Sequence, residues 1–558
     1  MKILGGSQRS CLKKIVLGAH PLIQYYLERL RVPQIVRSYV ISDKRLRLPT
    51  ELGVGLFVHN ILTDPLPLYG IAEWLEPLEP ESLGLSCEEA AIVNDDRLGR
   101  VLDALAKSNR KSIFFRIALR AIKIFELDCR QIHHDTTSVK FCGRYETWRY
   151  EPRVDYGHSK DHRPDLKQLV LGINVVGDGA VSIGHEAYSG NRTDDTVHVS
   201  NWDRLRRLLQ TSDFIYTADS KLCTHTNLSH IEFYGGQYIT VMPRTWKEDQ
   251  GFRQQARVGK VKWRLILKRK SNRQPNTEID EYYTTTSSHQ TECGRRLIWI
   301  RSTQKAEADR QARANHIDKT VKALQQLNTK LNKYKLKRLE EITAAVRAIL
   351  TEHQTTNLIE YSIKKRVVVT KTFLQKGRPT AKSPSRTRRR IEYQLTFKID
   401  QKELSKQSRT DGVFPLLTNI REKSAKEVLE IYKFQSFLEN RHSQLKTYLE
   451  VAPVFLKNPD RVLALLDLVL LSLCVATLME RDLRHGMKRH GVTSIPIYPE
   501  ERECQHPTTH SIMRVFRDVE KFEISDRQND IKEYFPPELT DLQKQILTLM
   551  EVPISLYA

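Results

Sequence analysis

The run Ile132-His133-His134-Asp135-Thr136-Thr137-Ser138-Val139-Lys140-Phe141 is rich in β-branched residues and carries an acid, Asp135, near its middle. This composition is typical of a β-strand. Similar runs follow at 168–176 and 180–188, and the Gly177-Asp178-Gly179 between them is a hairpin signal. We therefore predict three consecutive strands, the first of which carries Asp135.

Helices and strands alternate after this hairpin. A helix is predicted to begin near Asp194 and to bury Trp202, Leu205 and Leu208, and further strands are predicted over 214–218 and 238–242. Three strands followed by helix, strand, helix and strand indicate an α/β fold with a mixed five-stranded sheet and flanking helices. This pattern covers the first part of a core, residues 126–249.

The segments on either side of this core differ from it. Residues 17–125 have apolar residues at helical spacing, with a helix cap predicted at Asn94, so 1–125 is predicted to be a helical N-terminal domain. Its role is left open between DNA-end binding and dimerisation. The second part of the core is placed at 406–490. A C-terminal tail, 491–558, has a predicted helix over 539–550, and it either contributes to an assembly contact or covers the core.

Residues 250–405 are predicted to form an α+β insertion domain. Strand-like runs at 263–267, 297–301, 365–371 and 393–399 surround a long helical stretch. Its apolar residues between Ile317 and Ile349 recur at a period of about 3.5 to 3.6. This stretch is either a coiled-coil arm or a helix lying on its own domain.

Charge indicates the class of partner. Lys and Arg number 90 against 67 Asp and Glu, which gives a net charge of +23 and a pI near 9.5. Such an excess attracts polyanions and favours DNA or RNA as the partner. The eight cysteines are scattered without a C-x-x-C pair, which argues against a zinc ribbon or a disulfide framework and fits the reducing cytoplasm.

A basic cluster lies between Lys376 and Arg390, where seven basic residues occur without an acid. Gly377, Pro379 and Pro384 are expected to prevent regular structure there. An uncompensated cluster of this size repels itself unless a polyanion neutralises it, so we predict a DNA-backbone contact rather than a solvated loop. The residues named for this contact are Arg386, Arg388, Arg389 and Arg390.

The nearly apolar stretch 462–479 is close to the length of a membrane span. It contains Asp467, Ser472 and Thr477, and no second hydrophobic segment accompanies it. We predict a buried core helix and no membrane.

Two acids are placed at strands. Asp135 lies inside the first strand-like run, and Asp219 ends the run 214–218. Two carboxylates side by side repel each other, and one of them takes up a proton unless a cation lies between them. Mg²⁺ prefers such hard oxygen ligands and keeps waters that a substrate phosphate can replace.

A third acid lies on a helix predicted from Ser424, which has the capping-box partner Glu427, to Leu449. At about 100° per residue, four residues of this helix fall within an arc of about 60°. They are Tyr432, Gln435, Glu439 and Lys446. A broad apolar stripe on another side is suited to packing on a sheet.

The pattern Tyr432-x2-Gln435-x3-Glu439-x6-Lys446 resembles the Y-x2-R-x3-E-x6-K signature of DDE transposases from bacterial insertion sequences. The resemblance covers roughly residues 17–485, with further segments in the expected order. These are Asp95-Asp96-Arg97-Leu98-Gly99-Arg100, Asp135-Thr136-Thr137-Ser138, the run from Tyr156 to Asp165, Gly190-Asn191-Arg192-Thr193-Asp194, Ala218-Asp219 and Asp411-Gly412. It implies an RNase H-like core that an insertion domain interrupts between the second Asp and the Glu. The intervals agree, at 84 positions from Asp135 to Asp219 and 220 from Asp219 to Glu439.

The resemblance also implies an activity, namely metal-dependent cleavage at transposon ends followed by strand transfer into target DNA. Asp135, Asp219 and Glu439 would be catalytic and would hold two Mg²⁺ ions, for which Mn²⁺ substitutes. The implied partner is double-stranded DNA, both terminal inverted repeats and target, bound by a homodimer in the bacterial cytoplasm at the nucleoid.

Three residues of the signature helix would contact DNA: Tyr432, Gln435 and Lys446. The signature Arg is Gln435 here, which supplies a hydrogen bond but no charge. Lys433 and Arg441 are candidates to compensate for this missing charge.

A second DNA contact is predicted in the run 158–165. A loop that places Lys160 and Arg163 near DNA is favoured over a zinc pair of His158 and His162, because Pro164 disfavours the helix that such a pair needs.

Two other functions remain open. Asp219-Ser220-Lys221 with Asp135 upstream also fits the loose pattern of restriction-type endonucleases. A domesticated transposase that binds DNA without cutting it is the non-enzymatic alternative.

Overall fold

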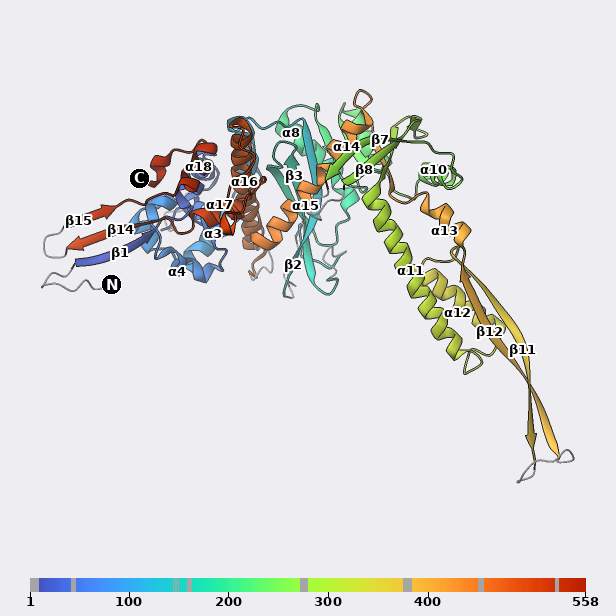
Figure 1. The fold of residues 1–558 in the computed structure, drawn as a ribbon. Coiled ribbons are helices and arrows are strands. Elements are labelled where there is room, and N and C mark those ends of the chain that lie inside the picture. The colour runs from blue at the N-terminus through green and yellow to red at the C-terminus, as the bar shows by residue number, and fades with distance from the viewer. Residues whose placement is uncertain are drawn as a thin grey trace. The chain divides into compact units, whose positions relative to one another are not determined.

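The computed structural model describes residues 10–41, 47–143, 145, 148, 150–157, 163–270, 279–374, 384–449, 456–526 and 531–558. The chain divides into two compact units (Figure 1). The first unit comprises residues 1–240 and 427–558, and the second comprises 241–426.

The sheet of the first unit has the order β4-β3-β2-β5-β6. Its strands are β2 (Gln131–Phe141), β3 (Lys167–Val176), β4 (Ser182–Ser189), β5 (Ile215–Thr217) and β6 (Gln237–Val241). The first three are antiparallel neighbours, whereas β5 runs parallel to β2 and β6 runs parallel to β5. The five predicted runs are therefore strands, and the mixed α/β sheet is confirmed.

Helices cover this sheet. They include α8 (His198–Leu209), α9 (His225–Phe233), α14 (Ala425–Lys433), α15 (Gln435–Ser443) and α16 (Pro459–Arg489). Trp202 of α8 is fully buried, as its place in the predicted apolar stripe requires. The segment expected as one helix over 424–449 is divided: a turn at Phe434 separates α14 from α15, and a π-helical turn, η4 (Gln444–Tyr448), follows α15.

The N-terminal region is helical, as predicted. Its helices are α1 (His20–Arg29), α2 (Val32–Tyr39), α3 (Thr50–Thr63), α4 (Ile71–Leu75), α5 (Cys87–Ala91), α6 (Asp95–Lys107) and α7 (Arg110–Ile124), with the 3₁₀ turns η1 (Leu68–Gly70) and η2 (Pro80–Leu83). The Asn94 side chain accepts a hydrogen bond from the Arg97 backbone N–H and caps α6 where the sequence predicts a cap.

The C-terminal tail folds onto the N-terminal region. It contains η5 (Pro499–Glu501), α17 (Thr509–Phe516), β14 (Glu520–Asp526), β15 (Ile531–Phe535), α18 (Asp541–Leu549) and η6 (Ile554–Tyr557). Strand β1 (Ser10–Val16) pairs with β14, which pairs with β15. The tail is thus a part of the first unit and covers it.

Helix α16 contains the apolar stretch 462–479. Among the described helices it is the one with the length and composition to cross a membrane, and 89% of its most apolar window is buried inside the protein. It packs against α3, α6, α17, α18 and β4. Its apolar side chains therefore pack in the core of the first unit, as the sequence predicts.

The second unit combines a sheet with a helical hairpin and a ribbon. The sheet order is β13-β10-β8-β7, and β9 pairs with β10. The elements are α10 (Lys247–Arg257), β7 (Trp263–Lys270), β8 (Ile279–Thr285), β9 (His289–Gln290), β10 (Arg296–Ser302), α11 (Thr303–Lys330), α12 (Leu339–Glu352), β11 (Ile359–Phe373), β12 (Ser385–Ile399), α13 (Gln401–Ser408) and β13 (Val413–Thr418).

The apolar residues that recur between Ile317 and Ile349 are divided between two helices, α11 and α12. Leu324 and Leu327 of α11 pack with Ile342 and Val346 of α12 and with Leu395 of β12 in one buried cluster. This settles the alternative left by the sequence, because the helix lies on its own unit and is not a coiled-coil arm.

Candidate active site

Asp135 and Asp219 lie on neighbouring strands at the same level of the sheet. In the parallel pairing of β2 with β5, His133 lies opposite Thr217, an interval of 217 − 133 = 84 positions. The interval between the two aspartates is the same, 219 − 135 = 84. Each acid therefore stands two residues beyond this last pair, and the separation noted in the sequence is the register of the two strands.

Backbone N–H groups orient both carboxylates. The Thr136 N–H donates to Oδ1 of Asp135 over 2.8 Å, and the Lys221 N–H donates to Oδ1 of Asp219 over 2.9 Å. The backbone carbonyl of Asp219 accepts a hydrogen bond from Thr240 Oγ1. The Asp135 side chain is 24% exposed, so solvent and ligands reach it.

Helix α15 is held against β2 by a side-chain amide. Gln435 Nε2 donates to the backbone carbonyl of His134 over 2.9 Å, and Gln435 Oε1 lies 3.1 Å from Nδ1 of His133. The ring of Phe434 packs on His133 with centroids 5.0 Å apart. These contacts anchor the first turn of α15 at the residues that precede Asp135.

The same helix brings two further side chains to this region. His442 Nδ1 lies 3.6 Å from Oδ2 of Asp135. Gln435, Glu439 and His442 are spaced i, i+4 and i+7, which places them on one face of a helix. Because both Gln435 and His442 face β2, Glu439 lies on the face of α15 that is turned toward Asp135.

Three acids influence the pKa of Tyr432. Burial raises the pKa of Tyr432, and the carboxylates of Asp219, Glu439 and Asp135 raise it further. Coulomb interactions fall with distance, so all three charges lie in the neighbourhood of this one side chain. Asp135, Asp219 and Glu439 thus all act electrostatically on the same side chain, Tyr432.

A shared metal ion would require these acids to stand close to one another. Across the described parts of the chain, no three His, Cys, Asp or Glu side chains stand close enough to hold a metal ion as drawn. The donors are nevertheless hard carboxylate oxygens, the type that Mg²⁺ prefers. A shared metal site thus fits the chemistry of these donors and requires the carboxylates to approach one another.

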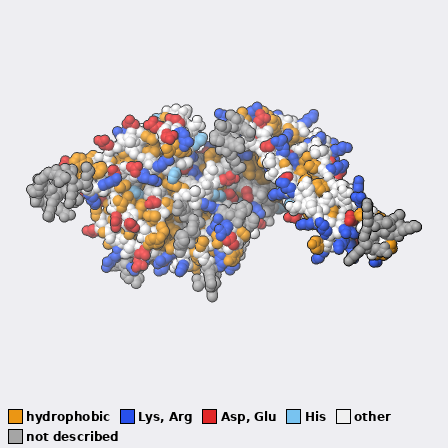
Figure 2. Space-filling model, turned by 60° about the horizontal axis from the view of Figure 1, so that its bottom comes forward, with side chains coloured by type: hydrophobic (Ala, Val, Ile, Leu, Met, Phe, Trp, Pro, Cys, Tyr) orange, Lys and Arg blue, Asp and Glu red, His pale blue; other side chains and the backbone are white. Residues whose placement is uncertain are grey.

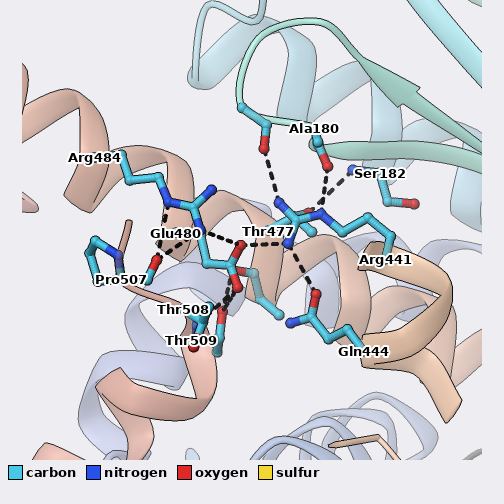
Figure 3. Close-up of polar contacts among 12 residues, drawn as sticks. Ala180, Ser182, Arg441, Gln444, Thr477, Glu480, Arg484, Pro507, Thr508 and Thr509 are labelled. Atoms are coloured by element: carbon cyan, nitrogen blue, oxygen red, sulfur yellow. Dashed lines mark hydrogen bonds and ion pairs between the residues drawn. The ribbon is translucent and has the colours of Figure 1, made fainter. Parts of the chain in front are cut away.

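A buried ion-pair network fixes the other side of α15 (Figure 3). The Arg441 guanidinium donates to the carbonyl oxygens of Gly179 and Ala180, each over 3.0 Å, and to Glu480 of α16 over 2.5 Å. Burial alone would raise the pKa of Glu480, but the charges of Arg441 and Arg484 and the N–H of Thr509 outweigh it and lower this pKa. Arg441 is 5% exposed, so it does not supply the missing DNA-contacting charge.

A second buried network lies behind β2, on the face that α8 covers. His134 Nδ1 lies 3.1 Å from Oδ1 of Asn174, Asn174 and Asn201 exchange hydrogen bonds, and Asn201 donates to the hydroxyl of Tyr216. Burial lowers the pKa of His134 well below its usual value. The sequence signal that could have predicted this network is Asn174, a polar residue in the middle of an apolar strand.

The predicted DNA-contact residues fall into different environments. Both ends of the Gln435 amide are engaged by β2, so a phosphate contact would cost these bonds; its position is that of an anchor rather than of a DNA contact. Lys446 is half-buried in η4, and Arg163 forms a two-pronged ion pair with Asp165. Lys160, His158 and His162 lie outside the described residues.

The second half of the basic cluster is a correction to the expected irregular loop, and residues 375–383, which hold Lys376, Arg378 and Lys382, lie outside the described residues. Arg386, Arg388, Arg389 and Arg390 lie in β12, whose pairing with β11 continues without a break to Phe373. Pro384 is compatible with this because it precedes the first strand residue, Ser385.

Two motif glycines allow a close backbone approach beside the sheet. A Cβ on Gly157 would collide with the carbonyl oxygen of Gly190, and a Cβ on Gly190 would collide with that of Gln168. The Gly190 N–H donates to the carbonyl of Arg153, and Gln168 Nε2 donates to the carbonyl of Gly190. Thr136 Oγ1 also donates to Asp194, so two of the sequence segments meet next to Asp135.

Comparison with known proteins gives three findings. Residues 13–119 match a family model described as a domain of unknown function, DUF4277. No curated protein matches the chain. Among solved structures, a cryo-EM structure of a piggyBac transposase synaptic complex with hairpin DNA is similar, with a TM-score of 0.40 and 9% sequence identity over 96% of this chain and 80% of that chain.

Proposed function

We propose that this protein is a DNA transposase that cleaves DNA at transposon ends and transfers the strands into target DNA. The observation that carries the proposal is the equivalent placement of Asp135 and Asp219 relative to the paired strands β2 and β5, with Gln435 holding the helix of Glu439 against β2. The order of the five strands supports an RNase H-like core of the DDE type. The net charge of +23 supports double-stranded DNA as the partner.

Asp135, Asp219 and Glu439 are the residues that would hold two Mg²⁺ ions, or Mn²⁺ in their place. When bound, such ions activate water or a DNA 3′-hydroxyl and stabilise the leaving oxygen of an in-line displacement at phosphorus. The chain's own residues position the acids: Gln435 ties α15 to β2, and the Arg441–Glu480 pair ties α15 to α16.

Tyr432 has a supporting role in this proposal. Burial and the three carboxylates raise its pKa, which disfavours the phenolate, so Tyr432 is proposed to orient DNA rather than to act as the nucleophile. Lys446 follows Glu439 by two helical turns and is proposed as a point-charge contact to a phosphate, and Arg163 with Lys160 as a second contact. Joining two DNA ends implies a homodimer on DNA, in the cytoplasm.

Strand cleavage on duplexes bearing the element's terminal repeats tests the proposal. Asp135→Ala, Asp219→Ala and Glu439→Gln should each abolish Mg²⁺-dependent cutting while DNA binding persists. Asp213→Ala is the matched control, because this exposed aspartate precedes β5 at the end opposite Asp219. Wild-type-like cutting by any of the three variants would remove that residue from the mechanism.

The same assay separates the alternatives. Dispensable Glu439 with an essential Lys221 would indicate a restriction-type endonuclease instead. Duplex binding without metal-dependent cutting by the wild-type protein would indicate a non-catalytic DNA-binding protein.

A further inference from the structure

The β11–β12 ribbon has a supported base and an unsupported arm. The strands pair from Ile359↔Ile399 to Phe373↔Ser385. Near the base, alternate residues such as Ile363 and Leu395 pack on α11 and α12. Asn332 closes the outer edge of β12 by donating to the carbonyl of Tyr393 over 2.9 Å and accepting from its N–H over 2.7 Å.

Between Tyr393 and the tip of the ribbon, the described residues are not part of the hydrophobic cluster formed with α11 and α12. Figure 1 shows it continuing past the ends of α11 and α12. Val367 and Val369 are each 56% exposed and Ile391 is 47% exposed on one face, and Arg386, Arg388 and Arg390 are exposed on the other, so both faces are open to solvent. Ten residues of strand, 364–373, span about 30 Å at about 3.3 Å per residue. A two-stranded ribbon without a core is marginally stable alone, so an arm of this length calls for a partner.

The composition of the arm favours a polyanion as its partner. Segments 364–373 and 385–394 contain eight basic residues and one acid, Glu392, which pairs with Arg390 over 3.2 Å. On the face of the second unit seen in Figure 2, Lys and Arg side chains are far more frequent than Asp and Glu. The aromatic residues of these two segments, Phe373 and Tyr393, stand at opposite ends of the arm, and this spacing disfavours single strands because successive bases are bound by stacking.

The strand register sorts the basic residues into two faces. Residues directly opposite each other share a face, and successive residues alternate between faces. Arg386, Arg388 and Arg390 lie opposite Thr372, Thr370 and Val368 on one face. The same face carries Arg366 with Glu392 opposite it, and Lys364. We call these four arginines the arginine face. The opposite face carries Lys365, Lys371 and Arg389 together with the exposed Val367, Val369 and Ile391.

We propose that the arm is a duplex-DNA-binding ribbon whose arginine face contacts the phosphates that border the major groove. The major groove, about 12 Å wide, admits a two-stranded ribbon. Every second residue of β12 presents a guanidinium, so the contacts repeat about every 6.7 Å along the strand. Guanidinium groups bind phosphate with strong, two-pronged hydrogen bonds. The inference deepens the proposed function and rests on it only for the class of partner.

Binding of the full-length protein to a labelled 30-base-pair duplex, measured by anisotropy in EDTA over a range of salt, tests this. Arg386→Ala/Arg388→Ala should reduce affinity at low salt and make the slope of log K against log salt shallower by about 1.8, or about 0.9 for each lost phosphate contact. The matched control, Lys365→Ala/Lys371→Ala, removes the same charge from the opposite face and should change the slope by less than half as much. Arg386→Lys/Arg388→Lys keeps both positive charges, so its slope of log K against log salt should be close to that of the wild-type protein.

Each other outcome decides against the inference. Equal slope changes in the two alanine pairs would mean diffuse attraction, and tighter binding of the matched single strand would exclude a duplex ribbon. If Arg386→Ala/Arg388→Ala binds DNA like the wild type while Asp135→Ala still abolishes cutting, the proposal for the ribbon is wrong and the proposed function stands. If the wild-type protein does not bind duplex at all, both fail.

Discussion

Gln435 donates a hydrogen bond to the backbone carbonyl of His134 over 2.9 Å, directly before Asp135 in β2. The other end of the same amide lies 3.1 Å from Nδ1 of His133. Gln435 precedes Glu439 by one helical turn, so this contact sets how the helix acid stands relative to the strand acid. A guanidinium at this position would donate but could not accept from His133. Gln435, which stands in place of the signature Arg, is thus suited to β2 because both ends of its amide have a partner on this strand.

Gln435→Ala should therefore weaken both the fold and the site. It leaves the half-buried polar groups of β2 without their partner, which costs about 1–3 kcal/mol. It also loosens α15 beside Asp135, so we expect slower cleavage than this stability loss accounts for. Urea denaturation and single-turnover cleavage measure the two effects. Asn440→Ala, at an exposed position of the same helix, is the control. Equal stability and rate in the two variants would contradict the anchoring role.

The sheet and its two aspartates were predictable because their signals are local. β-branched residues mark β2, the hairpin glycines separate β3 from β4, and Asp219 directly follows a short apolar run. The interval of 84 positions became informative once it proved to be the pairing register of β2 and β5.

The signature helix was less predictable because its shape depends on distant contacts. A wheel at a constant angle per residue assumes one uninterrupted helix, but the turn tightens at Phe434, where the N–H lies 3.1 Å from the carbonyl of Ile431. Phe434 packs on His133, and Arg441 reaches Glu480. Likewise, the basic residues of β12 were expected in a loop because Gly377, Pro379 and Pro384 lie near them, whereas pairing with β11 orders the chain from Ser385 onward.

The buried pair Arg441–Glu480 should be costly to break singly. Glu480→Gln leaves the Arg441 guanidinium, 5% exposed, with an uncompensated charge, which costs about 3–5 kcal/mol. Replacing both residues with methionine removes the charges together, so the double variant should lose less stability than the two single losses added. Urea denaturation of the wild type, Arg441→Met, Glu480→Met and the double methionine variant closes the cycle. Strict additivity would show that the pair does not act as a unit.

Stability should depend on pH through His133. Burial lowers the pKa of His133 to about 4, although the hydrogen bond with Gln435 opposes this. The unfolded chain, with a pKa near 6.5, binds the proton first. The stability linked to His133 is therefore fully present above about pH 6.5 and is lost as the pH falls toward 4, by about 1.4 kcal/mol per pH unit.

His133→Asn isolates this contribution, because its amide can still donate to Gln435 but does not titrate in this range. The free energy of unfolding of the variant should fall less steeply than that of the wild type between pH 6 and pH 4.5, whatever its value at pH 7.5. Parallel curves for the two proteins would show that His133 takes up its proton normally in the folded state.

Tyr432→Phe tests whether the tyrosine hydroxyl takes part in bond making. Burial and the three carboxylates raise its pKa, so the phenolate needed for attack on phosphorus is not formed at assay pH. Loss of a hydroxyl that contacts DNA by one hydrogen bond would cost about 0.5–1.5 kcal/mol and should slow cleavage by about 10-fold or less. The pH profile should stay unchanged, and denaturing gels should show no DNA joined to protein. Tyr234→Phe, with an exposed ring stacked under Arg206, is the control. A covalent adduct in the wild type that disappears in Tyr432→Phe would instead make this tyrosine the nucleophile, with the acids acting on it rather than on metal ions.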